Sequence, residues 1–150
     1  MATHTAKENL EKYLSRIADF EESVQSREDE QSRFGIWLHR SALYLRKLEN
    51  YFAGTMLPQH TEQFYTICEN DFALQARSEQ MRAHDRYLEQ RLRDIRQQFA
   101  YVARSLEPNP SELSRLIEQC LDTAAELRRH ELEINKWFDQ SLLRLHPSAS

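Results

Sequence analysis

Three of the six histidines in this 150-residue chain stand where their side chains could act together. His60 lies four residues before Phe64, and His84 and His130 each lie three residues after one apolar residue and four before the next. Residues three and four apart share one face of a helix, so all three imidazoles should face a core. Neutral imidazole is a common ligand of transition metals. His60, His84 and His130 are therefore candidate ligands of one metal ion.

Long helices must position these histidines, because the composition leaves little room for tight turns. The chain has only 2 glycines and 4 prolines, and 29% of its residues are charged, which is typical of helical proteins. Apolar residues recur at three- and four-residue steps along four segments. We expect one all-α domain over residues 1–150, an antiparallel up-down four-helix bundle. The expected helices cover residues 7–26, 32–69, 77–106 and 111–144.

The second expected helix should be kinked near Pro58 and then continue. Pro58 cannot donate a hydrogen bond to the carbonyl of Gly54, and its ring crowds that carbonyl, but a glycine there has no side chain to worsen the distortion. A turn is expected around residues 70–77, where Asn70 and Asp71 favour a helix start. Without that turn, residues 59–106 would form one helix about 70 Å long.

The levels of the three histidines agree with this arrangement. Two residues of an antiparallel helical hairpin lie at one level when they are equidistant from the turn, and both midpoints, residues 72 and 107, fall in expected turns. We therefore predict that His60, His84 and His130 share a plane and point into one interior region. If they are buried without metal, burial should lower the pKa of each, and folding should weaken as the pH falls through about 6.5.

Charge and motif content exclude several classes of function. The net charge is -4 and the arginines alternate with acidic residues, so no nucleic-acid partner is expected. No apolar run approaches the roughly 20 residues that span a bilayer, and the first residues hold no apolar leader, which predicts a cytoplasmic protein. No spacing pairs a nucleophile with a base. A binding protein is therefore predicted rather than an enzyme.

Three segments of the chain resemble a known family in their order and spacing. The runs "YFAGTMLPQHTEQFYTI", "RSEQMRAHDRYLEQRL" and "ELRRHELEINKWFDQSL" are similar to the second, third and fourth helices of hemerythrin-like (HHE cation-binding) domains. The resemblance covers about residues 7–144. It implies a helical bundle that holds a non-haem di-iron centre and binds dioxygen or related small molecules. His60, His84 and His130 match the family's metal-binding histidines.

The ligand set departs from that family at several positions. The family's glutamates come four residues after two of the histidines, and here these positions are Phe64 and Ile134. Glu133, three residues after His130, can replace one of them on nearly the same face. The first helix supplies no histidine. A reduced site is therefore expected, in which the three histidines, with Glu133, hold one iron, zinc or copper ion.

Two functions stay open at this point. The first is a hemerythrin-like protein that binds or senses a metal ion or a small molecule. The second is a metal-free helical scaffold that contacts a protein partner through exposed aromatic residues such as Trp37, Tyr44 and Tyr51. Either form can assemble into a homo-oligomer. The sequence names neither the ligand nor the partner.

Overall fold

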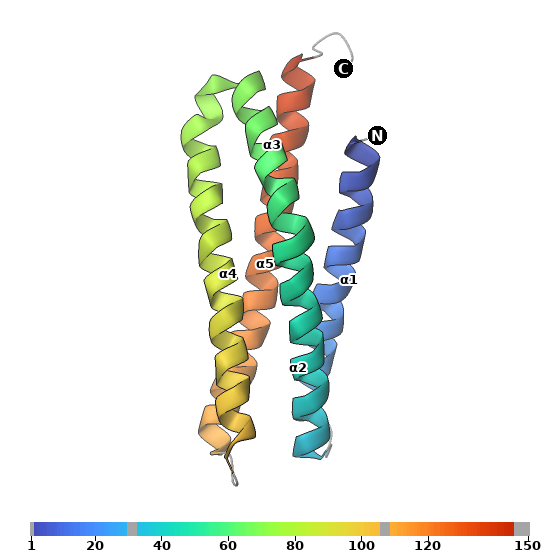
Figure 1. Ribbon diagram of the computed structural model, residues 1–150, viewed down its shortest axis with the longest axis vertical. Coiled ribbons are helices and arrows are strands. Elements are labelled where there is room, and N and C mark those ends of the chain that lie inside the picture. The colour runs from blue at the N-terminus through green and yellow to red at the C-terminus, as the bar shows by residue number, and fades with distance from the viewer. Residues whose placement is uncertain (1, 30–32, 106–108, 146–150) are drawn as a thin grey trace.

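The computed structural model describes residues 2–29, 33–105 and 109–145, and these form helices without a strand. The helices are α1 (Ala2–Asp29), α2 (Phe34–Tyr51), α3 (Leu57–Asn70), α4 (Gln75–Ala103) and α5 (Pro110–Leu145). A π-helical turn, Phe52–Met56, joins α2 to α3, so the described residues make four antiparallel rods (Figure 1). The predicted all-α, up-down four-helix bundle is confirmed. Within the described residues, no helix combines the length and apolar character needed to cross a membrane.

The predicted helices each correspond to one rod. The first is longer than the predicted 7–26 at both ends, because its outer turns are polar and give no apolar periodicity. The rod of α2 and α3 ends one residue after the predicted 69, and α5 extends one residue beyond 111–144 at each end. The predicted start at residue 32 and the predicted end at residue 106 lie outside the described residues.

The turn between α3 and α4 falls within the predicted range 70–77. Asp71 leaves the helical conformation, with φ -147° and ψ 93°, and its side chain accepts a hydrogen bond of 3.1 Å from the N–H of Ala73. A short 3₁₀ turn, Phe72–Leu74, then leads into α4. An aspartate that bonds the backbone two residues ahead is a common way to turn the chain. This turn sets α3 and α4 antiparallel and brings their inward faces together.

The interior of the bundle is divided into two apolar regions with a polar layer between them. The larger region includes Phe52, Met56, Leu88 and Leu127 and extends along α1, α2, α4 and α5. The smaller region, near the turn between α3 and α4, is built by Phe64, Ile67, Met81 and Ile134. On α3, α4 and α5 the buried residues between these two regions are polar. The bundle therefore encloses a polar layer at one defined level.

The π-helical turn determines which residue of α3 enters that layer. Phe52, Met56, His60 and Phe64 are all buried and follow each other in steps of four. In a regular α-helix each such step drifts about 40° around the axis, so a run of them would leave the core face. The wider π turn absorbs the drift, and Leu57 donates to the carbonyl of Phe52, five residues back. His60 therefore points inward in spite of Pro58 two residues before it.

Gly54 is not required by this turn, in contrast to the role expected for it beside Pro58. Its φ is not positive, and a Cβ atom at this position would meet no atom within 4 Å. We therefore expect Gly54→Ala to raise the free energy of unfolding by about 0.5–1 kcal/mol, since alanine restricts the unfolded chain. Urea denaturation followed by circular dichroism would measure this change. A loss of stability would mean that the π turn needs glycine.

The aromatic residues predicted to be exposed do not form a free surface. Trp37 is fully buried, and its indole N–H donates to the carbonyl of Val24 at 3.2 Å. Its ring centroid lies 5.9 Å from that of Phe99 on α4. Tyr44 and Tyr51 are half-buried against the large apolar region. The prediction that Trp37 is exposed is wrong, because the inward face of α2 begins one residue earlier than the expected stripe at Leu38.

Candidate metal centre

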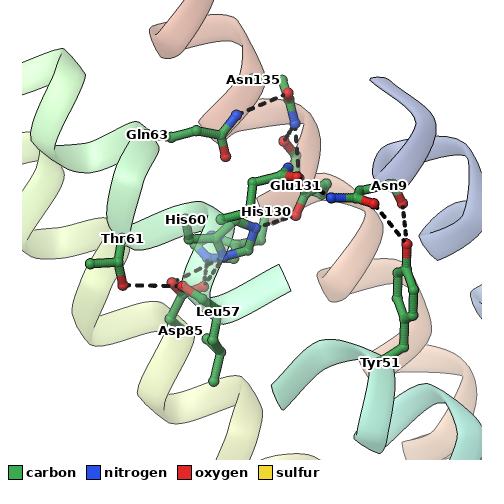
Figure 2. A network of polar contacts seen from close by, with 11 residues as sticks. Asn9, Tyr51, Leu57, His60, Thr61, Gln63, Asp85, His130, Glu131 and Asn135 are labelled. Carbon is green, nitrogen blue, oxygen red and sulfur yellow. Dashed lines mark hydrogen bonds and ion pairs between the residues drawn. The ribbon is translucent and has the colours of Figure 1, made fainter. Parts of the chain in front are cut away.

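Four side chains from three helices form the polar layer. His60 comes from α3, Asp85 from α4, and His130 and Glu131 from α5 (Figure 2). His60 and Glu131 have no exposed surface, and His130 and Asp85 are 3% and 6% exposed. Ionisable groups are almost never buried to this extent unless they are paired or bind a metal. The contacts among these four residues therefore decide what the layer can do.

Both ring nitrogens of His60 face carboxylates. Nδ1 lies 2.9 Å and 3.1 Å from the two carboxylate oxygens of Asp85, and Nε2 lies 2.5 Å from Oε2 of Glu131. Ionised carboxylates only accept hydrogen bonds, so each nitrogen of His60 must donate. His130 approaches the same carboxylate, with Nε2 2.7 Å from Oδ1 of Asp85. Asp85 thus joins the two imidazoles.

These contacts shift the protonation of His60 and Asp85. Burial by itself lowers the pKa of His60, but the hydrogen bonds to Asp85 and Glu131 outweigh it and raise the pKa to about 9. Burial raises the pKa of Asp85, yet the bonds from His130 and His60 leave it below its usual value. The expectation that burial lowers the pKa of every one of the three histidines is wrong for His60. That expectation did not include Asp85 and Glu131, whose carboxylates stabilise the proton on His60.

The expected lowering of the pKa does occur at His84, for the expected reasons. Burial and the neighbouring His130 lower the pKa of His84. Its side chain is nevertheless 39% exposed, so it lies at the edge of the layer. The ring centroids of His84 and His130 are 4.4 Å apart, and those of His60 and His130 are 5.9 Å apart. The three histidines gather at one level as predicted, but the side chain of His84 is not enclosed in the interior.

A second set of polar side chains holds Glu131. Its Oε1 accepts a hydrogen bond of 2.9 Å from the amide of Asn135, which also bonds the carbonyl of Glu131 at 2.8 Å. The amide of Gln63 reaches Asn135 at 3.4 Å (Figure 2). Tyr13 of α1 is also buried nearby, and burial together with the charges of Glu131 and Asp85 raises its pKa well above 10.0. The carboxylate of Glu131 is therefore fixed before any ion binds.

Glu133, the carboxylate singled out in the sequence, lies outside this layer. It forms an ion pair with Arg77 of α4, and both side chains are substantially exposed. The carboxylate that accompanies His130 in the interior is Glu131 instead. Glu133 is not part of the buried cluster of His60, Asp85 and His130, and its role as a metal ligand stays a prediction.

Asp85 and Glu131 were missed although the sequence carries a signal for both. Asp85 is four residues after Met81 and three before Leu88, and Glu131 is four after Leu127 and three before Ile134. Each carboxylate thus occupies a position of the apolar stripe, where a charged residue needs a partner. The spacing test applied to the histidines finds both residues when it is applied to acidic side chains.

The atoms of this layer suit a divalent transition metal. One atom each of His60, Asp85 and His130 can be chosen so that all three lie within 4.8 Å of one another. Zinc and iron bind imidazole nitrogen and carboxylate oxygen at about 2.0–2.2 Å. The contacts of 2.7 Å and 2.9 Å to Asp85 Oδ1 are those of hydrogen bonds, so an ion would replace the shared protons and move the ligands apart by a few tenths of an ångström. The donor set therefore fits such an ion.

Comparison with known proteins adds no assignment to this site. No family model, curated protein or solved structure matches the chain. The resemblance to hemerythrin-like domains stays a prediction. The function must be inferred from the contacts and chemistry of the described residues.

The raised pKa of His60 predicts how the stability of the metal-free protein depends on pH. A group whose pKa rises from 6.5 to about 9 on folding stabilises the fold fully below its unfolded pKa. That contribution disappears as the pH rises through about 9. We therefore expect the free energy of unfolding to fall between about pH 7 and 10.

Urea denaturation with a chelator present, at a series of pH values, would measure this dependence. His60→Gln is the control, because it removes the titrating group and should make the profile flatter over this range. A free energy of unfolding that stays constant from pH 7 to 10 and falls only between pH 7 and 5 would contradict the pairing. Such a profile belongs to buried histidines that stay neutral, because the pKa of a free histidine is about 6.5.

Proposed function

We propose that this protein binds one divalent transition-metal ion in the middle of its helical bundle, through His60, Asp85 and His130. The observation that carries the proposal is the buried group of three ligand atoms within 4.8 Å, drawn from three different helices. Such convergence needs α3, α4 and α5 to be packed together, so it arises only in the folded chain. The proposal treats the chain as a hemerythrin-like domain with a reduced metal site.

Charge in the layer supports this proposal. Asp85 and Glu131 bring two buried negative charges, and a protonated His60 offsets only one of them. A divalent cation bound to neutral imidazoles would offset both. Buried charges are tolerated when they are paired or coordinate a metal. Protons and a metal ion are thus alternative ways to neutralise the same carboxylates, and metal binding should release protons.

The contacts also suggest separate roles for the two carboxylates. Asp85 Oδ1 faces both His60 Nδ1 and His130 Nε2, so these three atoms are the proposed ligands. Glu131 faces the other nitrogen of His60 and would orient the ring by accepting its N–H. A carboxylate behind a metal-bound histidine is a common arrangement in metalloproteins. Three protein ligands leave coordination positions for a small molecule, which would make the protein a metal-dependent binder or sensor.

The apolar neighbours of the layer favour one ion over two. Phe64 and Ile134 occupy the positions at which the resembled family has glutamates, and both are fully buried in the smaller apolar region. Neither can bridge a pair of cations. Two ions in this volume would also bring four positive charges against two buried carboxylates. A mononuclear centre of iron or zinc is therefore proposed in place of a di-iron centre.

The alternative is a metal-free scaffold whose polar layer is a proton-bridged network. The burial of Trp37 removes one aromatic contact that this alternative relied on. Exposed aromatic residues do occur elsewhere, among them Tyr65, Phe72, Tyr87 and Tyr101. A protein partner, a homo-oligomer and a cytoplasmic location stay predictions.

Metal analysis of the purified protein, produced with added iron, zinc and copper, tests the proposal. We expect close to one ion per chain, and expect His60→Ala to lose it while His39→Ala, on an exposed position, keeps it. Two irons per chain with the absorption bands of an oxo-bridged pair would contradict the mononuclear centre. A protein that takes up no metal under any of these conditions would refute the proposed function and favour the scaffold.

A further inference from the structure

A surface hollow lies directly outside the polar layer, between α4 and α5. Its volume is about 460 Å³, and its lining residues are His84, Tyr87, Glu126, Arg129, His130 and Glu133. His130 is the lining residue that also belongs to the proposed metal site. The hollow therefore meets the buried centre at this one imidazole.

His130 has an unused nitrogen. Its Nε2 bonds Asp85, whereas its Nδ1 is buried and has no hydrogen-bond partner among the described residues. A buried polar atom without a partner costs free energy, so each such atom in a folded protein needs an explanation. His130 is 3% exposed, and its ring packs against the ring of His84 with centroids 4.4 Å apart. Nε2 of His130 thus serves the centre, and Nδ1 of this same hollow-lining residue is left without a partner among the described residues.

His84 and Glu126 stand together in the hollow. His84 Nε2 and Glu126 Oε2 are 4.0 Å apart, with side-chain exposures of 39% and 33%. This separation is too long for a hydrogen bond, and Glu126 Oε2 is a further buried atom without a hydrogen-bond partner within the described part of the chain. An ion about 2.0–2.2 Å from each atom would fit between them. Glu133, by contrast, is already paired with Arg77.

A second hollow, on another side of the polar layer, has different lining residues. It lies between α1, α3 and α5 and has a volume of about 390 Å³. Among its lining residues only Glu62 is charged, and none is a histidine. Gln63 lines this hollow and donates to Asn135, which in turn donates to Glu131. It lacks the imidazole and carboxylate pair that would attract and hold a transition metal.

We propose that the hollow between α4 and α5 is a loading site, where His84 and Glu126 bind the metal ion before His130 passes it to the buried centre. This inference rests on the proposed function, because it assigns a route to the same ion. A site on the route of entry is also a site on the route of exit. Its removal should slow binding and release by the same factor and leave the equilibrium affinity unchanged.

The rates of Co²⁺ uptake and release by the full chain test this assignment, since cobalt bound to nitrogen and oxygen ligands has visible absorption. Stopped-flow mixing gives the association rate, and transfer to a chelator gives the dissociation rate. For His84→Gln and for Glu126→Gln we expect both rates to fall about tenfold, with Kd within about twofold of the parent. Glu62→Gln is the matched control, because it removes one carboxylate from the other hollow, and it should leave both rates unchanged.

The remaining outcomes are distinguishable. Unchanged rates in His84→Gln and Glu126→Gln would overturn the loading site, and so would an equal slowing in Glu62→Gln, which would indicate general electrostatic attraction. A weaker Kd with faster release in His84→Gln would make His84 a permanent ligand and also overturn it. A parent protein that takes up no Co²⁺ would refute the proposed function itself, and the loading site with it. Circular dichroism of each variant confirms that the bundle is intact.

Discussion

Asp85→Ala should lower the free energy of unfolding of the metal-free protein by about 3–5 kcal/mol at pH 7. Asp85 accepts hydrogen bonds from His60 at 2.9 Å and from His130 at 2.7 Å, and it balances part of the charge of the buried imidazolium. Its removal leaves donors of both rings without that acceptor in the interior. Breaking a buried pair costs far more than the pair contributes, because the remaining charge is uncompensated. Urea denaturation with a chelator present measures the loss.

Glu133→Ala is the matched control for this experiment. It also removes a carboxylate from an ion pair between α4 and α5, but the side chains of Arg77 and Glu133 are 45% and 34% exposed. Exposed pairs contribute about 0–1 kcal/mol, so the control should lose less than about 1 kcal/mol. Similar small losses in both variants would contradict the buried network. In the Asp85→Ala background, His60→Ala should cost less than in the parent, because the two residues are coupled.

Glu131→Gln should weaken the equilibrium binding of a divalent metal ion by about 10–100-fold, although Glu131 is not one of the proposed ligands. Glu131 lies 2.5 Å from Nε2 of His60 and is itself fixed by Asn135. A carboxylate in this position fixes which nitrogen of the histidine carries the proton and makes the other a better ligand. Glutamine has nearly the same shape, so the change tests the charge and the accepted hydrogen bond rather than packing.

Competition between Co²⁺ and a chelator of known affinity would measure this effect at fixed pH. Glu133→Gln is the comparison variant. Glu133 is the carboxylate predicted from the sequence to join the metal site, and Glu131 is the one that the structure places in the polar layer. We expect Glu133→Gln to leave Kd within about twofold of the parent, in line with the small effect of an exposed charge pair. A larger loss in Glu133→Gln than in Glu131→Gln would reverse the assignment and restore the carboxylate predicted from the sequence.

Apolar periodicity by itself predicted the four rods and the level at which the histidines meet. Ile17, Phe20 and Val24 in α1, or Leu88, Leu92 and Ile95 in α4, can be buried together only if their segments are helical. The turn at Asp71 follows from local side-chain chemistry, which does not depend on the rest of the fold. Once the turns are known, the antiparallel rods fix the levels of His60, His84 and His130. These features depend on short-range spacing, which a sequence displays directly.

Spacing marks Asp85 and Glu131 as possible inward residues, but only the tertiary structure decided which acidic residues enter the layer. Neighbouring residues on a helix point about 100° apart, so a rotation of one rod by roughly half that angle exchanges Asp85 for His84 at the interior face. The rotation of α5 likewise separates the buried Glu131 from the paired and partly exposed Glu133 two residues later. The π-helical turn adds a further rotation about the helix axis between Tyr51 and His60, and no residue type in the sequence predicts this turn. Packing against three neighbouring helices fixes these rotations. A wrong rotation produces a clash or an unpaired buried charge only when the helices are packed together.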